Sequence, residues 1–387
     1  MKQAQGQFVA LKQESISHAL AINQDNKLLL VSDEFNFKLF YFKDGGLKFL
    51  QNIRCPILKQ EYTNTFNYIN TLNFYKKKQI FISGSDTLIN KWSYNLISNP
   101  KYIQRLEGQE YISSLVIHPL KENIIISGSK LGSIVFWFDQ PNYKRKPFLQ
   151  VISEHIKCVV GLSINNDGSK VISAGKDGII LVMEPISSSE FIWIVKQKIQ
   201  VQKHGYRICF INNDSFTFQP YGESQIHYYI LVNESFIKDK EFQIQLNLED
   251  CMYYFPQIYN TQKKILFSKC GNTLNILKHF EFQTEEQYKK SEQQFQLTQV
   301  IVFNEAYNPW IFGTVSEDGE YLIIFGWCIK EHSSKKIYNK ELNVIFKDEK
   351  LIFSNFLHLG QSLYCNKTIF IQTNQLNNKK MQAITFK

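Results

Sequence analysis

The feature that most constrains the fold of this chain is an internal repeat. Three segments align without gaps, and their first residues lie 46 and then 141 residues apart, which is three times 47. Looser copies begin at Ser32, Ser83 and Ser268. A repeat of this length indicates a chain built from similar units that bury their core against one another. The three aligned segments are SGSKLGSIVFW (127–137), SAGKDGIILVM (173–183) and TVSEDGEYLII (314–324).

Each unit reads as short apolar runs separated by tight turns. In the fourth unit, residues 159–164, 170–174 and 179–183 are apolar, and Asp177-Gly178 separates the last two runs. Asp-Gly is a strong hairpin signal because both residues tolerate a positive φ. A fourth strand is expected near residues 191–199, and no helical period competes. The pattern predicts a meander of four short strands per unit.

Units of this kind cannot bury both faces alone, so they are expected to stack radially as the blades of an all-β propeller. The units also resemble WD40 repeats, in the Ser-Gly-Ser before the turn, in Trp92 and Trp137 at the end of a strand, and in His155 at the start of the fourth unit. The resemblance covers roughly residues 7–346. It implies a rigid disc with two faces and a rim that bind peptides and protein domains.

The resemblance is to a divergent member of that family. A WD40 blade is typically locked by His, Ser or Thr, Asp and Trp, and no unit here has all four. The fourth unit has Met183 in place of Trp, and the third has Gln109 and Leu131 in place of His and Asp. We therefore expect apolar packing between blades to supply most of the stability. The positions matched to the family's structural residues are Ser83, Trp92, Ser127, Trp137, His155, Ser173, Asp177 and Asp318.

Markers near residues 32, 83, 127, 173, 218, 268 and 316 predict seven blades of four-stranded antiparallel sheet within residues 1–346. Residues 8–11 are expected to pair with the last blade and to close the ring. Residues 347–387 are interpreted as a strand-forming extension, with a degenerate eighth blade as the alternative. The repeats are expected near 16–53, 66–106, 111–152, 155–199, 204–247, 250–297 and 298–346.

The motifs of the common enzyme classes do not fit. Residues 161–165 resemble a nucleophile elbow but lack its final glycine, and residues 175–177 lack the first glycine and the Ser or Thr of a phosphate-binding loop. The eight histidines show no HxH or HExxH spacing. We therefore expect no catalytic residues, no metal site and no cofactor.

Two surface segments are candidates for partner binding. Tyr143, Lys144, Arg145 and Lys146 form a basic and aromatic cluster in a link between strands, where a solubilising loop is the simpler interpretation. Residues 281–299 are polar and are interpreted as an insertion, either a docking element or a flexible, lineage-specific insertion without such a role. The anchors of such a docking element would be Phe282, Tyr288 and Phe295.

These features favour a non-catalytic scaffold that binds proteins within a larger complex. A net charge of +9 favours acidic partners, and the alternative is a propeller that uses its basic patches to bind RNA or DNA. Seven cysteines without a CxxC pair suit a reducing compartment, so a cytoplasmic location is expected, with nuclear, cytoskeletal or ciliary association left open. The longest strongly apolar stretch, residues 321–329, is too short to span a bilayer, so no membrane insertion is expected.

Overall fold

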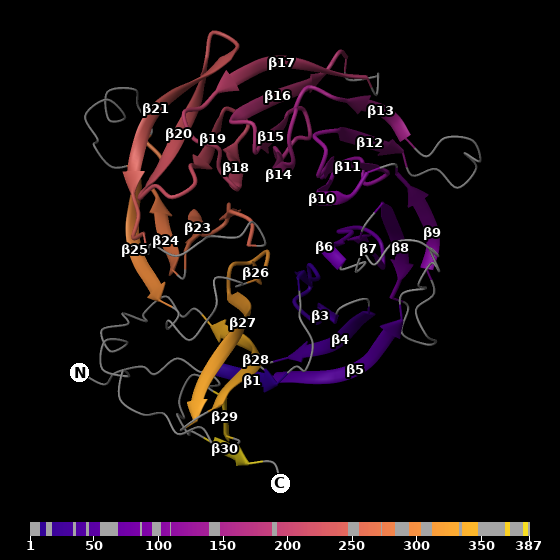
Figure 1. Ribbon diagram of the computed structural model, residues 1–387, viewed down its shortest axis with the longest axis vertical. Helices are drawn as coiled ribbons and strands as arrows, with labels where there is room; N and C mark the ends of the chain where they lie inside the picture. Colours follow the sequence, from indigo (N-terminus) through magenta and orange to yellow (C-terminus); the bar gives the residue numbers. More distant parts are fainter. Residues whose placement is uncertain are drawn as a thin grey trace.

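A computed structural model places the strands of the chain in a ring of antiparallel sheets around a central channel (Figure 1). Each four-stranded sheet forms one blade, and its innermost strand lines the channel. The residues described are 8–12, 18–33, 36–43, 46–54, 69–85, 87–94, 102–108, 110–138, 148–187, 192–246, 255–271, 273–282, 294–302, 312–332, 335–346, 368–371 and 382–385.

The first four blades each consist of four strands that run outward from the channel in chain order. Blade 1 contains β2 (Leu20–Ile22), β3 (Leu28–Asp33), β4 (Asn36–Lys43) and β5 (Gly46–Arg54). Blade 2 contains β6 (Ile69–Phe74), β7 (Ile80–Ser85), β8 (Leu88–Ser93) and β9 (Tyr102–Glu107). Blade 3 contains β10 (Ile112–Ile117), β11 (Ile124–Ser129), β12 (Ile134–Phe138) and β13 (Phe148–Ile152). Blade 4 contains β14 (Val159–Ile164), β15 (Val171–Gly175), β16 (Ile179–Pro185) and β17 (Trp193–Gln200).

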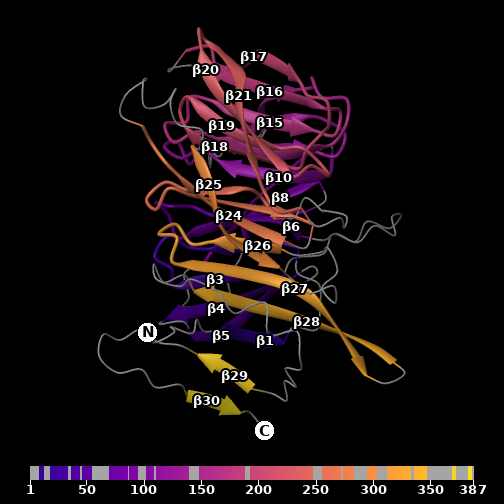
Figure 2. The same cartoon turned by 90° about the vertical axis from the view of Figure 1, so that its left-hand side faces the viewer.

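The remaining three blades complete the ring. Blade 5 contains β18 (Arg207–Asn212), β19 (Ser215–Gln219), β20 (Gln225–Val232) and β21 (Ser235–Gln243). Blade 6 contains β22 (Ile258–Asn260), β23 (Ile265–Cys270), β24 (Thr273–His279) and β25 (Phe295–Val302). Blade 7 contains β26 (Phe312–Val315), β27 (Tyr321–His332), β28 (Lys335–Phe346) and, as its outermost strand, β1 (Phe8–Lys12). The hairpin of β27 and β28 projects from the disc (Figure 2).

The ring closes through the amino-terminal strand, as predicted. β1 pairs antiparallel with β28, with Phe8 opposite Ile345 and Lys12 opposite Glu341. Blade 7 is therefore assembled from both ends of the propeller sequence. This pairing gives β28 a neighbour and removes an open sheet edge within the ring.

The described part of the chain contains seven four-stranded sheets, in agreement with the predicted number of blades. Beyond them, β29 (Thr368–Ile371) and β30 (Gln382–Thr385) pair with each other as a separate two-stranded sheet. Blade 6 extends to Val302, beyond the expected boundary at residue 297. The polar residues between 296 and 299 belong to the outer strand of this blade, so the expected insertion does not reach residue 299.

Apolar clusters join each blade to the next. Between blades 3 and 4, for example, Phe136 packs in one cluster with Met183 and Trp193. Corresponding clusters occupy the other six blade interfaces among the described residues. This arrangement follows from the sequence pattern, since the central strands of each blade are buried on both faces. The rigid disc therefore positions two sets of turns, one on each face.

The two faces are named here by their turns. The AB face carries the turns between the first and second strands of each blade. The BC face carries the turns between the second and third strands, together with the loops that enter each blade. In Figure 1 the BC face is toward the viewer.

Candidate functional site

Blade 4 contains a buried, hydrogen-bonded set of His, Ser and Asp side chains. His155 precedes β14, Ser173 lies on β15, and Asp177 lies in the turn that follows. The Nε2 atom of His155 is 2.9 Å from Ser173 Oγ, and its Nδ1 atom is 3.0 Å from Asp177 Oδ2. Asp177 also accepts hydrogen bonds from the backbone N–H groups of Ile156 and Ile179. The set ties the loop that enters the blade to its BC turn.

The same residue types form the nucleophilic triad of many hydrolases, so their exposure distinguishes a catalytic from a structural role. The side chains of His155 and Asp177 are 0% and 1% exposed, and Ser173 is 0% exposed. Burial lowers the pKa of His155, and the nearby Asp177 carboxylate opposes this change. Because the Ser173 hydroxyl has no access to solvent, these three residues serve as a structural lock.

Blades 2 and 3 contain the tryptophan part of the same pattern. The indole N–H of Trp92 donates to Ser83 Oγ at 3.0 Å, and that of Trp137 donates to Ser127 Oγ at 2.8 Å. In blade 4 the same register position holds Met183, which is fully buried. The lock is therefore divided between blades, and each blade contains only part of it.

A second buried polar network, in blades 5 and 6, was not predicted from the sequence. The side-chain amide of Gln257 donates to Ser268 Oγ at 2.9 Å and accepts from Thr217 Oγ1 at 2.8 Å. The Ser268 hydroxyl in turn donates to Gln219. In the sequence, only Ser268 pointed to this network, as a repeat position. A glutamine before a short strand does not reveal that its side-chain amide will be buried.

The structure corrects the assignment of Asp318. Asp318-Gly319 lies between β26 and β27, in an AB turn, and corresponds to Asp167-Gly168 of blade 4. Its carboxylate accepts from the Ser316 hydroxyl at 2.6 Å. The prediction that Asp318 matches Asp177, which lies in a BC turn, is wrong. An Asp-Gly pair predicts a hairpin but does not specify which hairpin of the blade it forms.

Most of the predicted anchor residues are not tested by the structure. Tyr143, Lys144, Arg145, Lys146 and Tyr288 lie outside the described residues, so they stay predictions. Phe282 is partly buried at the end of a described segment.

Phe295 is a core residue, and the expectation of an exposed anchor is wrong for it. This side chain is 3% exposed and stacks on His279, with ring centroids 4.5 Å apart. Its strand, β25, is the outer strand of blade 6, and its ring fills the interface with blade 5.

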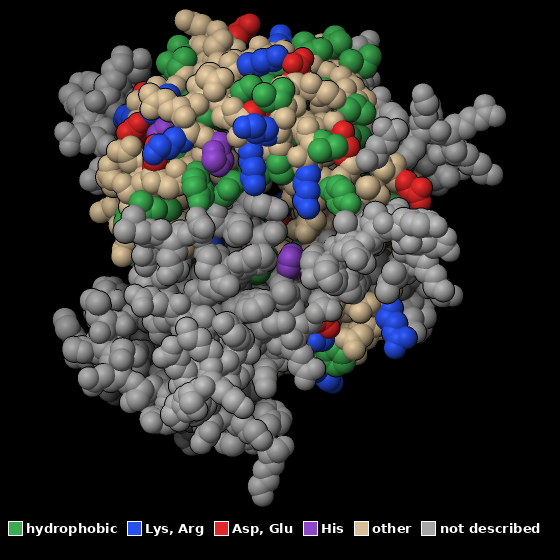
Figure 3. Space-filling view, viewed as in Figure 1, with side chains coloured by type: hydrophobic (Ala, Val, Ile, Leu, Met, Phe, Trp, Pro, Cys, Tyr) green, Lys and Arg blue, Asp and Glu red, His purple; other side chains and the backbone are tan. Residues whose placement is uncertain are grey.

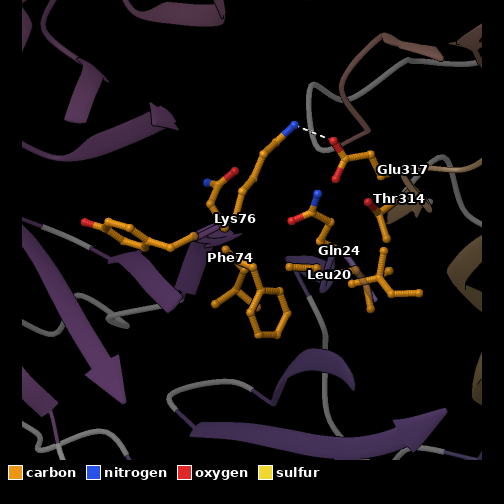
Figure 4. A pocket seen from close by; sticks show the side chains of 11 residues that line it. Leu20, Gln24, Phe74, Lys76, Thr314 and Glu317 are labelled. Atoms are coloured by element: carbon orange, nitrogen blue, oxygen red, sulfur yellow. Dashed lines mark hydrogen bonds and ion pairs between the residues drawn. The ribbon is translucent and has the colours of Figure 1, made fainter. Parts of the chain in front are cut away.

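The lysine-rich turn at residues 76–78 lies on the AB face, beside the channel (Figure 4). Lys76 Nζ is 2.5 Å from Glu317 Oε1 of blade 7, across a cavity of about 180 Å³. The backbone N–H groups of Lys76 and Lys77 donate to Glu122 Oε1 of blade 3, at 2.7 and 2.8 Å. Acidic groups of this chain therefore already occupy the turn, which reduces its attraction for a phosphate.

The channel contains a larger cavity of about 350 Å³ with a mixed polar and apolar lining. Burial lowers the pKa of His18, at its wall, to about 4, so this imidazole is neutral near pH 7. Within the described ranges, no group of three or more His, Cys, Asp or Glu side chains could hold a metal ion. All seven blades contribute to the wall, through residues that include His18, Thr71, Ser114, Gly161, Ile208, Gln257 and Gly313.

On the BC face, two large apolar side chains are exposed on neighbouring segments. Leu131 of blade 3 is 68% exposed, and Ile156 of blade 4 is 79% exposed. Their segments touch through Gly132, where an added Cβ would lie 2.3 Å from the carbonyl oxygen of His155. Gly132 also has φ +108°, which side-chain-bearing residues rarely adopt. Glycine at this position therefore allows the two loops to approach each other.

Lysines and aromatic rings surround this apolar pair. Lys130 Nζ lies 5.1 Å from the ring centroid of Tyr111, and Lys176 Nζ lies 5.5 Å from that of Tyr206. The ring of His204 lies 5.6 Å from that of Tyr206, and the Lys157 backbone adjoins Gly132. Burial lowers the pKa of His204, and the charges of Lys176 and Lys157 lower it further.

We call these residues the blade 3–5 patch. Figure 3 shows Lys and Arg side chains beside His and apolar side chains over β14, β15 and β18. The patch comprises Tyr111, Lys130, Leu131, Ile156, Lys157, Lys176, His204 and Tyr206. It was not predicted, because its members come from turns and loops of different blades.

Comparison with known proteins places this geometry in context. The family model "WD domain, G-beta repeat" matches residues 146–182, which include most of blade 4. A chain from a solved structure titled "Crystal Structure of Mitotic Checkpoint Complex" is similar over 87% of this chain and 90% of that chain, with a TM-score of 0.62 and 15% sequence identity. No curated protein matches. In the described ranges no helix is long and apolar enough to cross a membrane.

Proposed function

We propose that this chain, as a divergent member of the WD40-repeat family, is a non-catalytic scaffold that presents a rigid disc to partner proteins within a larger complex. The observation that carries the proposal is the blade 3–5 patch. Large apolar side chains exposed together on a folded surface are typical of interaction sites. Here Leu131 and Ile156 are exposed on loops that hydrogen bonds to Ser129 and Asp177 hold in place.

Rigidity of the disc supports the same proposal, because a preorganised surface loses less entropy on binding. Turns of neighbouring blades are joined on the AB face as well as on the BC face. Glu122 of blade 3 binds the turn of blade 2 through the Lys76 backbone, and Asn26 of blade 1 donates to Asp318 of blade 7. A partner would therefore meet a surface that changes little on binding.

The buried lock of blade 4 supports a non-catalytic role for the one described constellation that resembles an active site. Ser173 is inaccessible, and the hydrogen bonds of His155 are used to join a loop to a turn. Propeller folds host many functions, so this argument concerns the site and not the fold.

The similar solved structure supports membership of a complex only as an analogy. Its title names an assembly, and an identity of 15% limits the likeness to the fold. We also propose a cytoplasmic location, where thiols stay reduced; among the described residues, Cys158 and Cys209 form no disulfide.

Affinity capture of the tagged full-length protein from its native cell tests the proposal. One sample is treated with nuclease, one is washed at high salt, and the recovered proteins are identified by mass spectrometry. The scaffold function predicts a reproducible protein set that survives nuclease treatment. Loss of all partners on nuclease treatment would instead favour the nucleic-acid alternative, and recovery of no specific protein would contradict the proposal.

A further inference from the structure

We infer that the blade 3–5 patch binds an acidic segment of a partner protein that also carries apolar side chains. This inference rests on the proposed scaffold function and specifies the chemistry of the partner. In such a complex the apolar side chains lie on Leu131 and Ile156. The carboxylates of the segment pair with the lysines around them.

The apolar centre of the patch supplies the anchor. Leu131 and Ile156 are among the most exposed large hydrophobic residues described in this chain. Covering such a side chain favours binding in proportion to the apolar area removed from water. Because the Asp177 carboxylate accepts the Ile156 backbone N–H at 2.9 Å, the backbone that carries this side chain is held in place before a partner arrives.

The charges around this centre select an acidic partner. Among the described residues, the ammonium groups of Lys130 and Lys157 form no ion pair. Glu110, a nearby acid, accepts hydrogen bonds from the hydroxyls of Ser129 and Ser133. The patch lysines Lys130, Lys157 and Lys176 outnumber the two nearby carboxylates, Glu110 and Asp177. The formal charge around the apolar pair is therefore positive, and it would steer an anionic segment toward this pair.

The aromatic rings of the patch favour a protein over a nucleic acid. Binding of single-stranded nucleic acid uses exposed ring faces on which bases stack. Here Lys130 lies over the ring of Tyr111, and Lys176 lies over the ring of Tyr206. The most exposed groups at the centre are aliphatic, and they suit leucine- or isoleucine-like side chains of a peptide.

Selection of random peptides displayed on phage, panned against the immobilised full-length protein, tests this chemistry without a known partner. The inference predicts enrichment of peptides that combine Asp or Glu with at least one large apolar residue. Labelled copies of the enriched peptides are then titrated in fluorescence polarisation. Matched peptides in which every Asp and Glu is replaced by Asn and Gln are titrated in parallel.

Two double variants locate the binding. The first double variant reverses the charge of the patch and carries Lys130→Glu and Lys157→Glu. Its matched control reverses the charge of two exposed lysines on the outer strands β5 and β17 and carries Lys48→Glu and Lys196→Glu. The patch variant is expected to weaken binding by about tenfold or more, whereas the control retains it. Thermal unfolding of both variants confirms that they fold.

A second pair of variants tests the apolar anchor. Leu131→Ser with Ile156→Ser is expected to weaken binding by about tenfold or more. Its control, Ile103→Ser with Ile237→Ser, changes exposed residues on β9 and β21 and is expected to bind like the natural sequence.

Three outcomes would overturn the inference. They are enrichment of neutral or basic peptides, no enrichment above an empty surface, and equal loss of binding in the patch and control variants. Tighter binding of a labelled oligothymidine than of any acidic peptide at the patch would also overturn it, in favour of nucleic acid. The scaffold function is judged separately, by whether affinity capture recovers a specific protein set that survives nuclease treatment.

Discussion

The Nδ1 atom of His155 lies 3.0 Å from Oδ2 of Asp177, and the same carboxylate oxygen accepts the backbone N–H of Ile156 at 2.9 Å. A buried structural contact and an exposed apolar residue therefore share one acceptor. This relationship couples the stability of blade 4 to the shape of the blade 3–5 patch, so a change at Asp177 affects both.

Asp177→Ala is expected to lower the free energy of unfolding by about 3 kcal/mol, because it leaves His155 and the Ile156 N–H without their acceptor. Asp177→Asn keeps one oxygen acceptor and is expected to lower the free energy of unfolding by less than Asp177→Ala does. Urea titration measures both, and Asp214→Ala, at an exposed turn, is the control. If Asp177→Ala and Asp214→Ala unfold at the same urea concentration, the lock is unimportant.

Met183→Trp restores the residue that the repeat family has at this position, yet we expect it to destabilise the protein by about 1–3 kcal/mol. Met183 is fully buried in one cluster with Trp193, which stacks on Phe136 with ring centroids 5.0 Å apart. A second indole has no room there. Met183→Leu conserves volume and is the control, and a higher melting temperature for Met183→Trp would contradict this account.

The sequence was sufficient to predict the propeller, because each blade repeats the same turn chemistry and the same alternation of buried strands. Ser83, Trp92, Ser127 and Trp137 were found from the sequence because they stand at fixed distances from those turns. Asp318 was assigned to the wrong turn, because either the AB or the BC hairpin of a blade can contain Asp-Gly.

The patch could not be predicted in this way. Leu131 and Ile156 belong to turns and loops of different blades, and only the close packing of Gly132 against His155 brings them together. Phe295 was expected to be exposed because its sequence neighbours are polar. In the structure its strand buries the Phe295 ring. Contacts between distant segments depend on the assembled ring and not on local pattern.

His279 is expected to make the stability depend on pH. Burial lowers the pKa of His279 to about 4; the charge of Glu281 opposes this change and that of Lys264 adds to it. The Nδ1 atom of His279 lies 2.7 Å from the Tyr259 hydroxyl. In the unfolded chain this histidine binds a proton near pH 6.5. Its contribution to the free energy of unfolding is therefore complete above pH 6.5 and is lost as the pH falls toward 4.

The variant His279→Asn tests this pH dependence. It removes the titrating group, and it is expected to reduce the stability difference between pH 7 and pH 4.5 by about 2–3 kcal/mol. Urea titration at the two pH values measures this difference. Equal losses in the variant and the natural sequence would exclude His279 as a source of the pH dependence.

Removal of residues 1–12 is expected to lower the melting temperature and to promote self-association. The deletion removes β1 and leaves β28 as an open edge with unpaired backbone groups. Each lost backbone hydrogen bond contributes about 0.5–1.5 kcal/mol. Thermal unfolding and light scattering test this, with a deletion of residues 1–7 as the control that retains β1.

The central claim, that this chain is a protein-binding scaffold that uses the BC face, is tested most directly by photocrosslinking in the native cell. A benzophenone amino acid replaces Ile156, and in a control it replaces Ile103, which is 55% exposed on the outer strand β9. The account predicts discrete protein adducts at residue 156 that are weak or missing at residue 103. Equal adducts at both positions, or adducts to nucleic acid alone, would contradict it.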